Sequence, residues 1–147
     1  NSIKLGSGVI AVLCTQSECA FASKADQPSL PSSLGGPITS IKIHQLDDDC
    51  IMLFDDIYWA GNSVTVCEDI RALTAMDFND LSMSILVGRN VDYARLWRGS
   101  KWQKKNQAFW DADGDLSVVG LDECVSSAQL WTYPAQISRK FGPIQFS

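Results

Sequence analysis

Short apolar runs broken by turns dominate the chain, and sustained helical periodicity is hard to find. Seven runs of three to five residues have the composition of β-strands. These runs are Val9–Leu13, Ile41–Ile43, Ile51–Phe54, Ser63–Val66, Met83–Val87, Ala94–Trp97 and Ala128–Trp131. Turn-rich stretches separate them, and one of these, 26–34, contains prolines that cannot donate to a β-ladder. The pattern predicts an all-β protein.

One motif occurs three times at nearly constant spacing. Each copy begins with an apolar residue, continues through two small or acidic residues and two variable ones, and ends in a pair that closes with Ser before a β-type run. The copies are Leu34–Ile41, Phe78–Ile85 and Leu121–Ala128. The closing serines lie 44 and 43 residues apart, at Ser40, Ser84 and Ser127. Such a period indicates one supersecondary unit used repeatedly, and the order of hairpin, long connection and final strand predicts a Greek key in each repeat.

The second repeat resembles the βγ-crystallin Greek key in two signatures. Phe54 is followed seven residues later by Gly61 and then by Ser63, which is similar to the family's folded hairpin. There an aromatic ring packs over a bend whose glycine takes a conformation that favours residues without Cβ. The loop 79–84 is similar to the family's calcium motif of two Asn or Asp residues, two variable residues, Ser or Thr, and Ser.

The resemblance covers about residues 8–131 and implies a βγ-crystallin-like sandwich with three Greek-key motifs. Domains of this family pair two keys, so we expect a two-key domain at 1–90, and a third key with a C-terminal tail at 91–147. The unmatched third key is expected to expose an apolar face and to form a homo-oligomer through it. The alternative fold is a β-trefoil, which also has three repeats of this length.

The resemblance implies calcium as a ligand, since the loops offer the oxygen atoms that this cation prefers. In the family, one motif supplies its Ser or Thr hydroxyl and a nearby carbonyl, and its neighbour supplies the second-position carboxylate. If the first and second repeats pair, Thr39 and the Pro37 carbonyl would meet Asp80, which follows Asn79 in the motif.

The reciprocal site of that pair would need a carboxylate at Gly36 and a hydroxyl at Met83, and it has neither. A thioether is a poor calcium ligand, so we expect at most one weak site. Glu123 and Ser126 of the third repeat would need a partner loop, which another chain could supply.

Four of the five cysteines can be paired along hairpins. Cys14 and Cys19 bracket four residues as if they faced each other, and Cys50 and Cys67 are symmetric about a predicted turn at 58–59. Two disulfides favour a secreted location, and Cys124 is then a buried thiol or an intermolecular link. The alternative is that the cysteines are reduced and pack as small buried residues.

Charge and residue content exclude several functions. The net charge is −5, from 12 basic and 17 acidic residues, which argues against nucleic acid as a partner because a basic face is needed there. No apolar run approaches the length of a membrane span. His44 is the only histidine, and no nucleophile motif lies near it, so we expect no enzymatic activity.

The function expected from these observations is a secreted, non-enzymatic βγ-crystallin-like protein that serves as a structural or calcium-binding module. The alternative is an interaction protein with a protein or glycan target, such as an antimicrobial or killer toxin, a protease inhibitor or a carbohydrate-binding protein. Trp97 and Trp102 flank the basic hairpin at 95–105 and form the candidate ligand-binding face.

Overall fold

The computed structural model describes residues 2–16, 18–24 and 37–133. The 34–36 start of the first motif and the tail at 134–147 lie outside these residues. The described part of the chain forms nine strands and three short 3-10 helices. In chain order these are β1 (Val9–Cys14), β2 (Cys19–Ser23), β3 (Ser40–Gln45), β4 (Ile51–Phe54), η2 (Ile57–Trp59), β5 (Ser63–Val66), η3 (Leu73–Met76), β6 (Ser84–Val87), β7 (Val91–Gly99), β8 (Gln103–Phe109), η4 (Leu116–Val119) and β9 (Ser127–Thr132).

Each repeat forms one antiparallel sheet, and we call these the first, second and third sheets. Their strand orders are β2-β1-β3, β5-β4-β6 and β8-β7-β9. In each sheet the strand that follows the Ser motif returns to lie beside the first strand of the hairpin, which is the Greek-key connection. The predicted all-β Greek-key fold is therefore confirmed, and the β-trefoil alternative is not needed.

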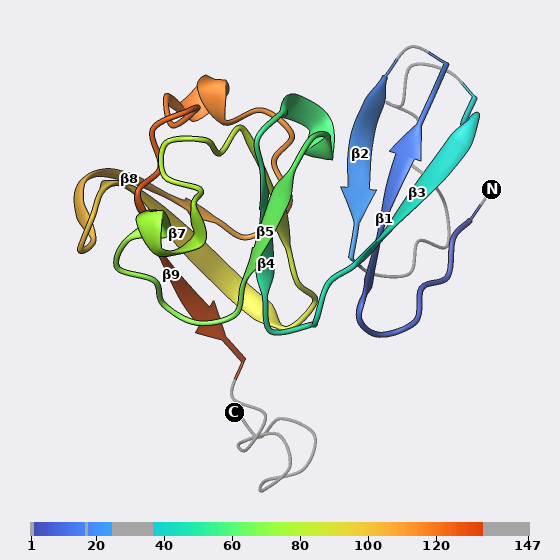
Figure 1. The fold of residues 1–147 in the computed structure, drawn as a ribbon. Helices are drawn as coiled ribbons and strands as arrows, with labels where there is room; N and C mark the ends of the chain where they lie inside the picture. The colour runs from blue at the N-terminus through green and yellow to red at the C-terminus, as the bar shows by residue number, and fades with distance from the viewer. Residues whose placement is uncertain (1, 17, 25–36, 134–147) are drawn as a thin grey trace, which may run out of the picture.

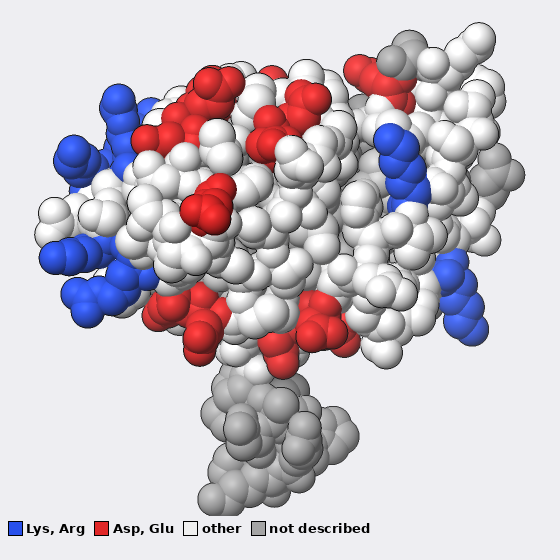
Figure 2. Space-filling view, in the orientation of Figure 1, with Lys and Arg blue, Asp and Glu red and all other residues white. Residues whose placement is uncertain are grey.

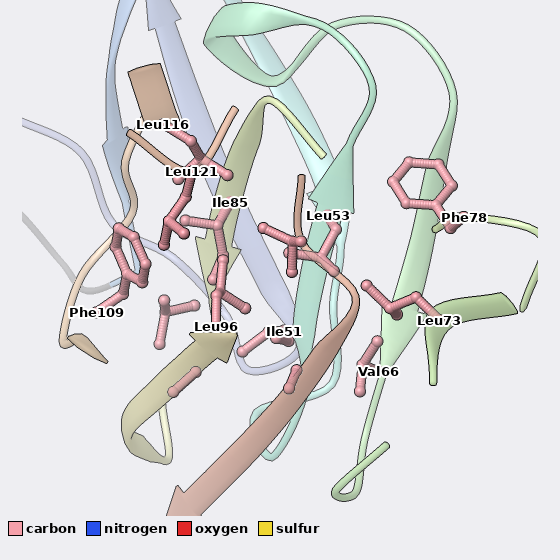
Figure 3. Close-up of a cluster of buried hydrophobic side chains, with 14 of the residues drawn as sticks. Ile51, Leu53, Val66, Leu73, Phe78, Ile85, Leu96, Phe109, Leu116 and Leu121 are labelled. Carbon is pink, nitrogen blue, oxygen red and sulfur yellow. The ribbon is translucent and has the colours of Figure 1, made fainter. Parts of the chain in front are cut away.

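The three sheets are stacked in layers, with the second sheet in the middle (Figure 1). The larger core lies between the second and third sheets and includes Ile51, Leu53, Ile85 and Leu96 (Figure 3). A smaller core lies between the second and first sheets. Because the second sheet is covered on both faces, β4 is apolar and buried along its whole length, whereas β7 alternates between buried and half-exposed positions.

The second and third repeats also exchange backbone segments. Ile70, in the connection of the second repeat, pairs with Ala128 on β9 through two N–H···O bonds of 2.9 and 3.0 Å. Asp113, in the connection of the third repeat, pairs with Ile85 on β6 in the same way, at 2.9 and 3.0 Å. Each connection thus adds an isolated β-bridge to the edge strand of the other repeat's sheet.

This arrangement differs from the expected pairing of the first repeat with the second. The second repeat shares its larger core with the third, and the key without such a mate is the first. The physical reason lies on the outer face of the second sheet, where Met52, Phe54 and Leu86 are apolar. The first sheet covers that face with Ile10 and Val12, so it packs as an extra layer and not as an interlocked partner.

Both predicted disulfides are present, Cys14–Cys19 within the β1–β2 hairpin and Cys50–Cys67 between the ends of β4 and β5. The free cysteine is Cys124. The helices in the described residues are single 3-10 turns, and none is long or apolar enough to cross a membrane.

Candidate functional site

The motif loops of the second and third repeats meet through reciprocal backbone hydrogen bonds. The Asp80 N–H donates to the Val125 carbonyl at 3.0 Å, and the Glu123 N–H donates to the Ser82 carbonyl at 2.9 Å. Asp80 and Glu123 hold equivalent motif positions and both have left-handed backbones, with φ of 59° and 52°. The two loops are therefore related by an approximate two-fold axis.

The closing serine of each motif fixes the folded hairpin to the loop. The Ser84 hydroxyl donates to the Asp56 carbonyl at 2.7 Å and accepts from the Trp59 N–H at 3.0 Å. Ser127 repeats this arrangement with the Gly99 carbonyl at 2.6 Å and the Trp102 N–H at 3.1 Å. Both serines are completely buried, so their hydroxyls are structural and are not free to bind a ligand.

One crosswise pair of oxygen donors comes together at this junction. The Ser126 hydroxyl lies 3.2 Å from Oδ1 of Asp80, on the facing loop. Asn79, Glu123 and Cys124 line the same surface cavity. Asp80 is the second residue of its motif and Ser126 is the fifth residue of the facing motif, which is the combination of carboxylate and hydroxyl expected for calcium. The two residues come from the second and third repeats, whereas the expected pair came from the first and second.

The structure does not bring Thr39 to Asp80. The Thr39 hydroxyl donates to the Cys14 carbonyl at 3.4 Å, within the first sheet, and the exposed Pro37 precedes it there. The first repeat covers the outer face of the second sheet, whereas Asp80 faces the third repeat, so the expected set from Pro37, Thr39 and Asp80 is not assembled. The partner loop for Glu123 and Ser126 is the second repeat of the same chain.

The reciprocal half of the junction lacks a hydroxyl. Met83 occupies the position that Ser126 holds in the third motif, and Glu123 occupies the position of Asp80. A thioether does not replace a hydroxyl as a ligand for a hard cation. The junction therefore offers a carboxylate and a hydroxyl together on one side only.

Two cationic side chains, Arg98 and Lys104, line the cavity that contains Asp80 and Ser126. Their charges oppose the binding of a divalent cation, because like charges repel across a short distance. The described residues also contain no cluster of three His, Cys, Asp or Glu side chains that could hold a metal. An ion at this junction would therefore depend on few carboxylates and on neutral oxygens.

The free thiol of Cys124 is half-buried beside this cavity, and its Sγ lies 3.7 Å from the Gly120 carbonyl. Burial raises the pKa of the Cys124 thiol, and Asp122 and Asp80 act in the same direction. Arg98 and Lys105 partly oppose the shift. The thiol is thus held in its protonated form at neutral pH, in which it is a weak nucleophile.

The two tryptophans named as a ligand face are committed to internal contacts. The Trp97 indole N–H donates to the Gln129 side chain at 3.1 Å, and the Trp102 indole N–H donates to the Ala128 carbonyl at 3.2 Å. Both residues are half-buried. The guanidinium of Arg71 lies 5.4 Å from the Trp102 ring centroid and covers part of it.

Sequence reasoning missed a second aromatic group, at the other end of the third sheet. Tyr93 lies between Trp110 and Trp131, with ring centroids 5.6 and 4.5 Å apart. The tryptophans are 56% and 38% exposed. Tyr93 pairs with Trp131 across β7 and β9, and Trp110 follows Phe109, the last residue of β8, which pairs with Ala94. The three rings are brought together by strand register, which the sequence alone does not give.

No protein-family model matches the chain, and no curated protein matches it in sequence. Solved structures do match. One is described as "Evolution of the eye lens beta-gamma-crystallin domain fold" (TM-score 0.57, 19% identity, 59% of this chain and 89% of the other). Another is the N-terminal domain of Protein S (TM-score 0.52, 22% identity, 58% of this chain and 98% of the other).

A third match is the βγ-crystallin domain of Abundant Perithecial Protein from Neurospora crassa in its Ca²⁺-bound form. It has a TM-score of 0.51 and 15% identity over 62% of this chain and 97% of the other. The matches extend over 89%, 98% and 97% of these three structures but over only 59%, 58% and 62% of this chain. This difference agrees with one two-key domain and an additional key in this chain. This chain therefore has the βγ-crystallin domain fold.

Proposed function

We propose that this protein is a secreted, non-enzymatic βγ-crystallin-like module that binds one calcium ion between its second and third repeats. The observation that carries the proposal is the 3.2 Å approach of the Ser126 hydroxyl to the Asp80 carboxylate across two loops. These two oxygens would hold the ion together with the backbone carbonyl of Cys124, the neighbouring loop residue in the same cavity. Bound calcium would neutralise the carboxylate and tie the two repeats together.

The affinity is expected to be weak for two reasons. Arg98 and Lys104 line the same cavity and repel a cation. The reciprocal half has Met83 where a hydroxyl is needed, so the chain has one site where a symmetric junction would have two. A calcium-bound domain of the same fold, from Neurospora crassa, supports calcium as the ion.

Secretion and the absence of catalysis have separate support. The two disulfides are of the kind that persist in oxidising compartments. The single imidazole, of His44, packs edge-on against Phe54 with 5.3 Å between ring centroids. Its Nε2 is buried without a hydrogen-bond partner among the described residues. A structural and ion-binding role fits this chemistry best.

Calorimetric titration of the metal-free protein with calcium tests the proposal. We expect one ion per chain and a thermal unfolding midpoint that rises with calcium concentration, since a ligand of the native state stabilises it. Ser126→Ala and Asp80→Asn should each abolish the heat. Thr39→Ala is the matched control, because this hydroxyl belongs to the first sheet and its loss should change nothing.

Met83→Thr is the gain-of-function variant. It supplies the hydroxyl that the reciprocal half lacks, opposite Glu123, and it should raise the stoichiometry towards two ions per chain. No heat at millimolar calcium, or a loss of binding in Thr39→Ala with Ser126→Ala unaffected, would contradict the calcium site.

We further propose that the protein self-associates through the first sheet. Ile41 and Ile43 are 50% and 56% exposed on the edge strand β3, whereas Leu13 and Ala11, paired with them on β1, are buried. The two isoleucines hold the positions of Ile85 and Val87, which are buried in the larger core because a paired key covers them. The β3 edge of a second copy would offer the same two isoleucines as a partner. Ile41→Ser with Ile43→Ser should shift a dimer to monomer in sedimentation experiments, and a monomeric native protein would contradict the proposal.

A further inference from the structure

The third sheet has one face in the larger core. We call its other face the outer face of the third sheet; Tyr93, Arg95, Trp97 and Gln129 are partly exposed on it, whereas Ala108 and Ser127 are buried. Strand register assigns its residues, since directly paired residues on neighbouring strands point to the same side of a sheet. Strand register forms two rows across β8, β7 and β9, Ala108–Arg95–Gln129 and Asn106–Trp97–Ser127, and it pairs Tyr93 with Trp131. Trp110, the residue after β8, completes a third row through its ring contact with Tyr93.

The equivalent face of the second sheet is buried and provides a comparison for the outer face of the third sheet. Positions 43 residues earlier in the chain hold Met52, Phe54 and Leu86 where the third sheet has Arg95, Trp97 and Gln129. The first sheet covers those three apolar side chains. On the third sheet the equivalent positions carry planar polar and aromatic groups, which can lie in water and still bind a ligand.

The aromatic row is ordered before any ligand arrives. Tyr93 stacks on Trp131 with 12° between the ring planes, and Trp110 contacts its other side at an angle of 32°. Each ring restricts its neighbour, so little side-chain entropy remains to be lost on binding. The tryptophans still expose 56% and 38% of their surface, which leaves apolar ring area for a ligand.

The next rows are hydrogen-bonded among themselves. The Arg95 guanidinium donates to the Asn106 side chain, and the Trp97 indole donates to the Gln129 side chain at 3.1 Å. These contacts hold a guanidinium and two amides in fixed positions on the sheet surface. Arg, Asn and Gln each offer more donors than these bonds use, and the spare groups suit a ligand rich in hydroxyls.

Positive charge gathers beyond the last row, at the β7–β8 hairpin. Arg98, Lys101, Lys104 and Lys105 lie on this hairpin, and two of them, Arg98 and Lys104, also line the cavity that contains Asp80 and Ser126. None of these four cationic side chains forms a salt bridge with another described residue. Figure 2 shows Lys and Arg concentrated at this end of a chain whose net charge is −5. An unpaired cationic cluster on an acidic protein is complementary to an anionic partner.

The opposite end of the face is acidic. Asp111 follows Trp110 and pairs with Lys24 at 3.7 Å, and Asp92 precedes Tyr93 and accepts a hydrogen bond from the Tyr133 hydroxyl. Nucleic acid carries a charge on every phosphate and would need cations along its whole path. A ligand that fits this face has an apolar, hydroxyl-rich part at the aromatic row and its negative charge at the hairpin.

We propose that the outer face of the third sheet binds an acidic polysaccharide, a sugar chain that bears carboxylate or sulfate groups. Sugar rings lie against the Trp110–Tyr93–Trp131 stack, their hydroxyls bond the row of Arg95 and Gln129, and the anionic groups reach the hairpin lysines. From Tyr93 to Gly99 the strand spans roughly 20 Å, which accommodates a short oligosaccharide along the strand.

The full chain is titrated in EDTA, which removes calcium from consideration, with a polygalacturonate octamer and with its methyl ester. The two share one backbone and differ in charge. Dextran sulfate and dextran form a second pair that distinguishes sulfate from carboxylate. We expect at least one anionic member to bind at least tenfold more tightly than its neutral counterpart, with an affinity that falls as salt is raised.

Three double variants locate the binding site. Trp110→Ala with Trp131→Ala should weaken binding at least fivefold and leave its salt dependence unchanged. Lys101→Asn with Lys104→Gly should weaken it to a similar extent and reduce the salt dependence; both new residues tolerate the left-handed backbone, with φ of 57° and 71° at these positions. Lys4→Gln with Lys42→Gln removes the same charge from exposed sites outside this face and should have no effect. Thermal unfolding verifies that each variant is folded.

Four results would overturn the proposal. The first is that charged and neutral sugars bind equally or that neither binds, and the second is that the Lys4/Lys42 and Lys101/Lys104 variants lose equal affinity. The third is that oligo(dT) or phosphatidylserine vesicles bind more tightly than either anionic polysaccharide. The fourth is that sedimentation shows a dimer that only the Trp110/Trp131 variant dissociates. The last result would identify the face as an interface between copies of this chain.

Discussion

Ser82 is a completely buried serine whose hydroxyl has no hydrogen-bond partner among the described residues. The equivalent position in the third motif is Val125, which lies in the larger core. The Ser82 backbone carbonyl accepts a hydrogen bond from the Glu123 N–H, so the loop uses the backbone of Ser82 and not its side chain. A buried hydroxyl without a partner costs about 1–3 kcal/mol of stability.

We therefore expect Ser82→Ala to raise the free energy of unfolding by about 1 kcal/mol, since it removes an unsatisfied hydroxyl at little loss of volume. Urea denaturation monitored by tryptophan fluorescence measures the change. The opposite substitution, Val125→Ser, is the control and should lower stability by at least as much. A destabilised Ser82→Ala protein would mean that the hydroxyl has a native partner.

His44 gives the molecule a predictable pH dependence. Burial lowers the pKa of this imidazole from its ordinary value of 6.5, and the nearby positive charge of Lys42 lowers it further. The unfolded chain then binds a proton at a higher pH than the folded chain does. The associated stability is fully present above pH 6.5 and is lost as the pH falls through 6.5 towards the folded pKa.

Urea unfolding at pH 7.5 and at pH 5.5 tests this sign. The native protein should lose stability between the two values, and His44→Gln, which does not titrate, should lose less. Carboxylates contribute equally to both proteins, so the difference between them isolates the imidazole. A larger acid loss in the His44→Gln protein would refute the assignment.

The folded hairpins of the second and third repeats share one backbone shape with different residues at the critical corner. Gly61 has φ of 79°, and Lys104 holds the equivalent position with φ of 71°. A Cβ added at Gly61 would collide with the Asp55 carboxylate, whereas Lys104 already carries one in the left-handed region. That conformation costs a residue with a Cβ about 1–2 kcal/mol.

Lys104→Gly should thus raise the free energy of unfolding by about 1 kcal/mol, after the extra freedom of glycine in the unfolded chain is subtracted. Gly61→Ala should lower it by more than that, because a steric collision is added to the backbone cost. Both changes are read from urea denaturation curves. If Lys104→Gly and Gly61→Ala changed the free energy of unfolding by the same amount in the same direction, the two hairpins would not be equivalent.

Most strands could be predicted from apolar runs, with two exceptions. Ile51–Phe54 and Ser63–Val66 match β4 and β5 residue for residue. Two strands were not among the predicted runs, β2 and β8. β8 begins Gln-Lys-Lys-Asn at the edge of its sheet, where half of the strand meets water and hydrophobic content gives little signal.

The pairing of the repeats was harder to predict, because all three share one motif and any two could have met. One indication lies in the sequence of β4, Ile-Met-Leu-Phe, which is apolar on both sides of the strand. A continuous apolar run is typical of a strand covered on both faces, so the second repeat belongs in the middle layer. For the candidate ion site, Asp80 and Ser126 were each named from the motif, but only the pairing shows that they face one another.

At the scale of the whole molecule, two cores divide the chain differently from the boundary expected at residue 90. The larger core holds residues from the second and third repeats only, and the smaller core attaches the first repeat to them. We propose that 47–133 is the independent two-key domain and that the first repeat is an added layer. The Cys14–Cys19 and Cys50–Cys67 disulfides each lie within one of these parts, so the division breaks no covalent link.

A chain of residues 47–133 alone should fold but aggregate, because Met52, Phe54 and Leu86 would become an exposed apolar face. At the equivalent positions the third sheet has the polar residues Arg95 and Gln129. Met52→Arg with Leu86→Gln should therefore keep the short chain soluble, with cooperative unfolding in urea. In the full chain the same pair should be destabilising by several kcal/mol, since an arginine would then be buried between two sheets without a partner. The opposite outcomes of one substitution pair distinguish an added layer from an integral one. A short chain that stays unfolded with both substitutions would show that the second and third repeats need the first to fold.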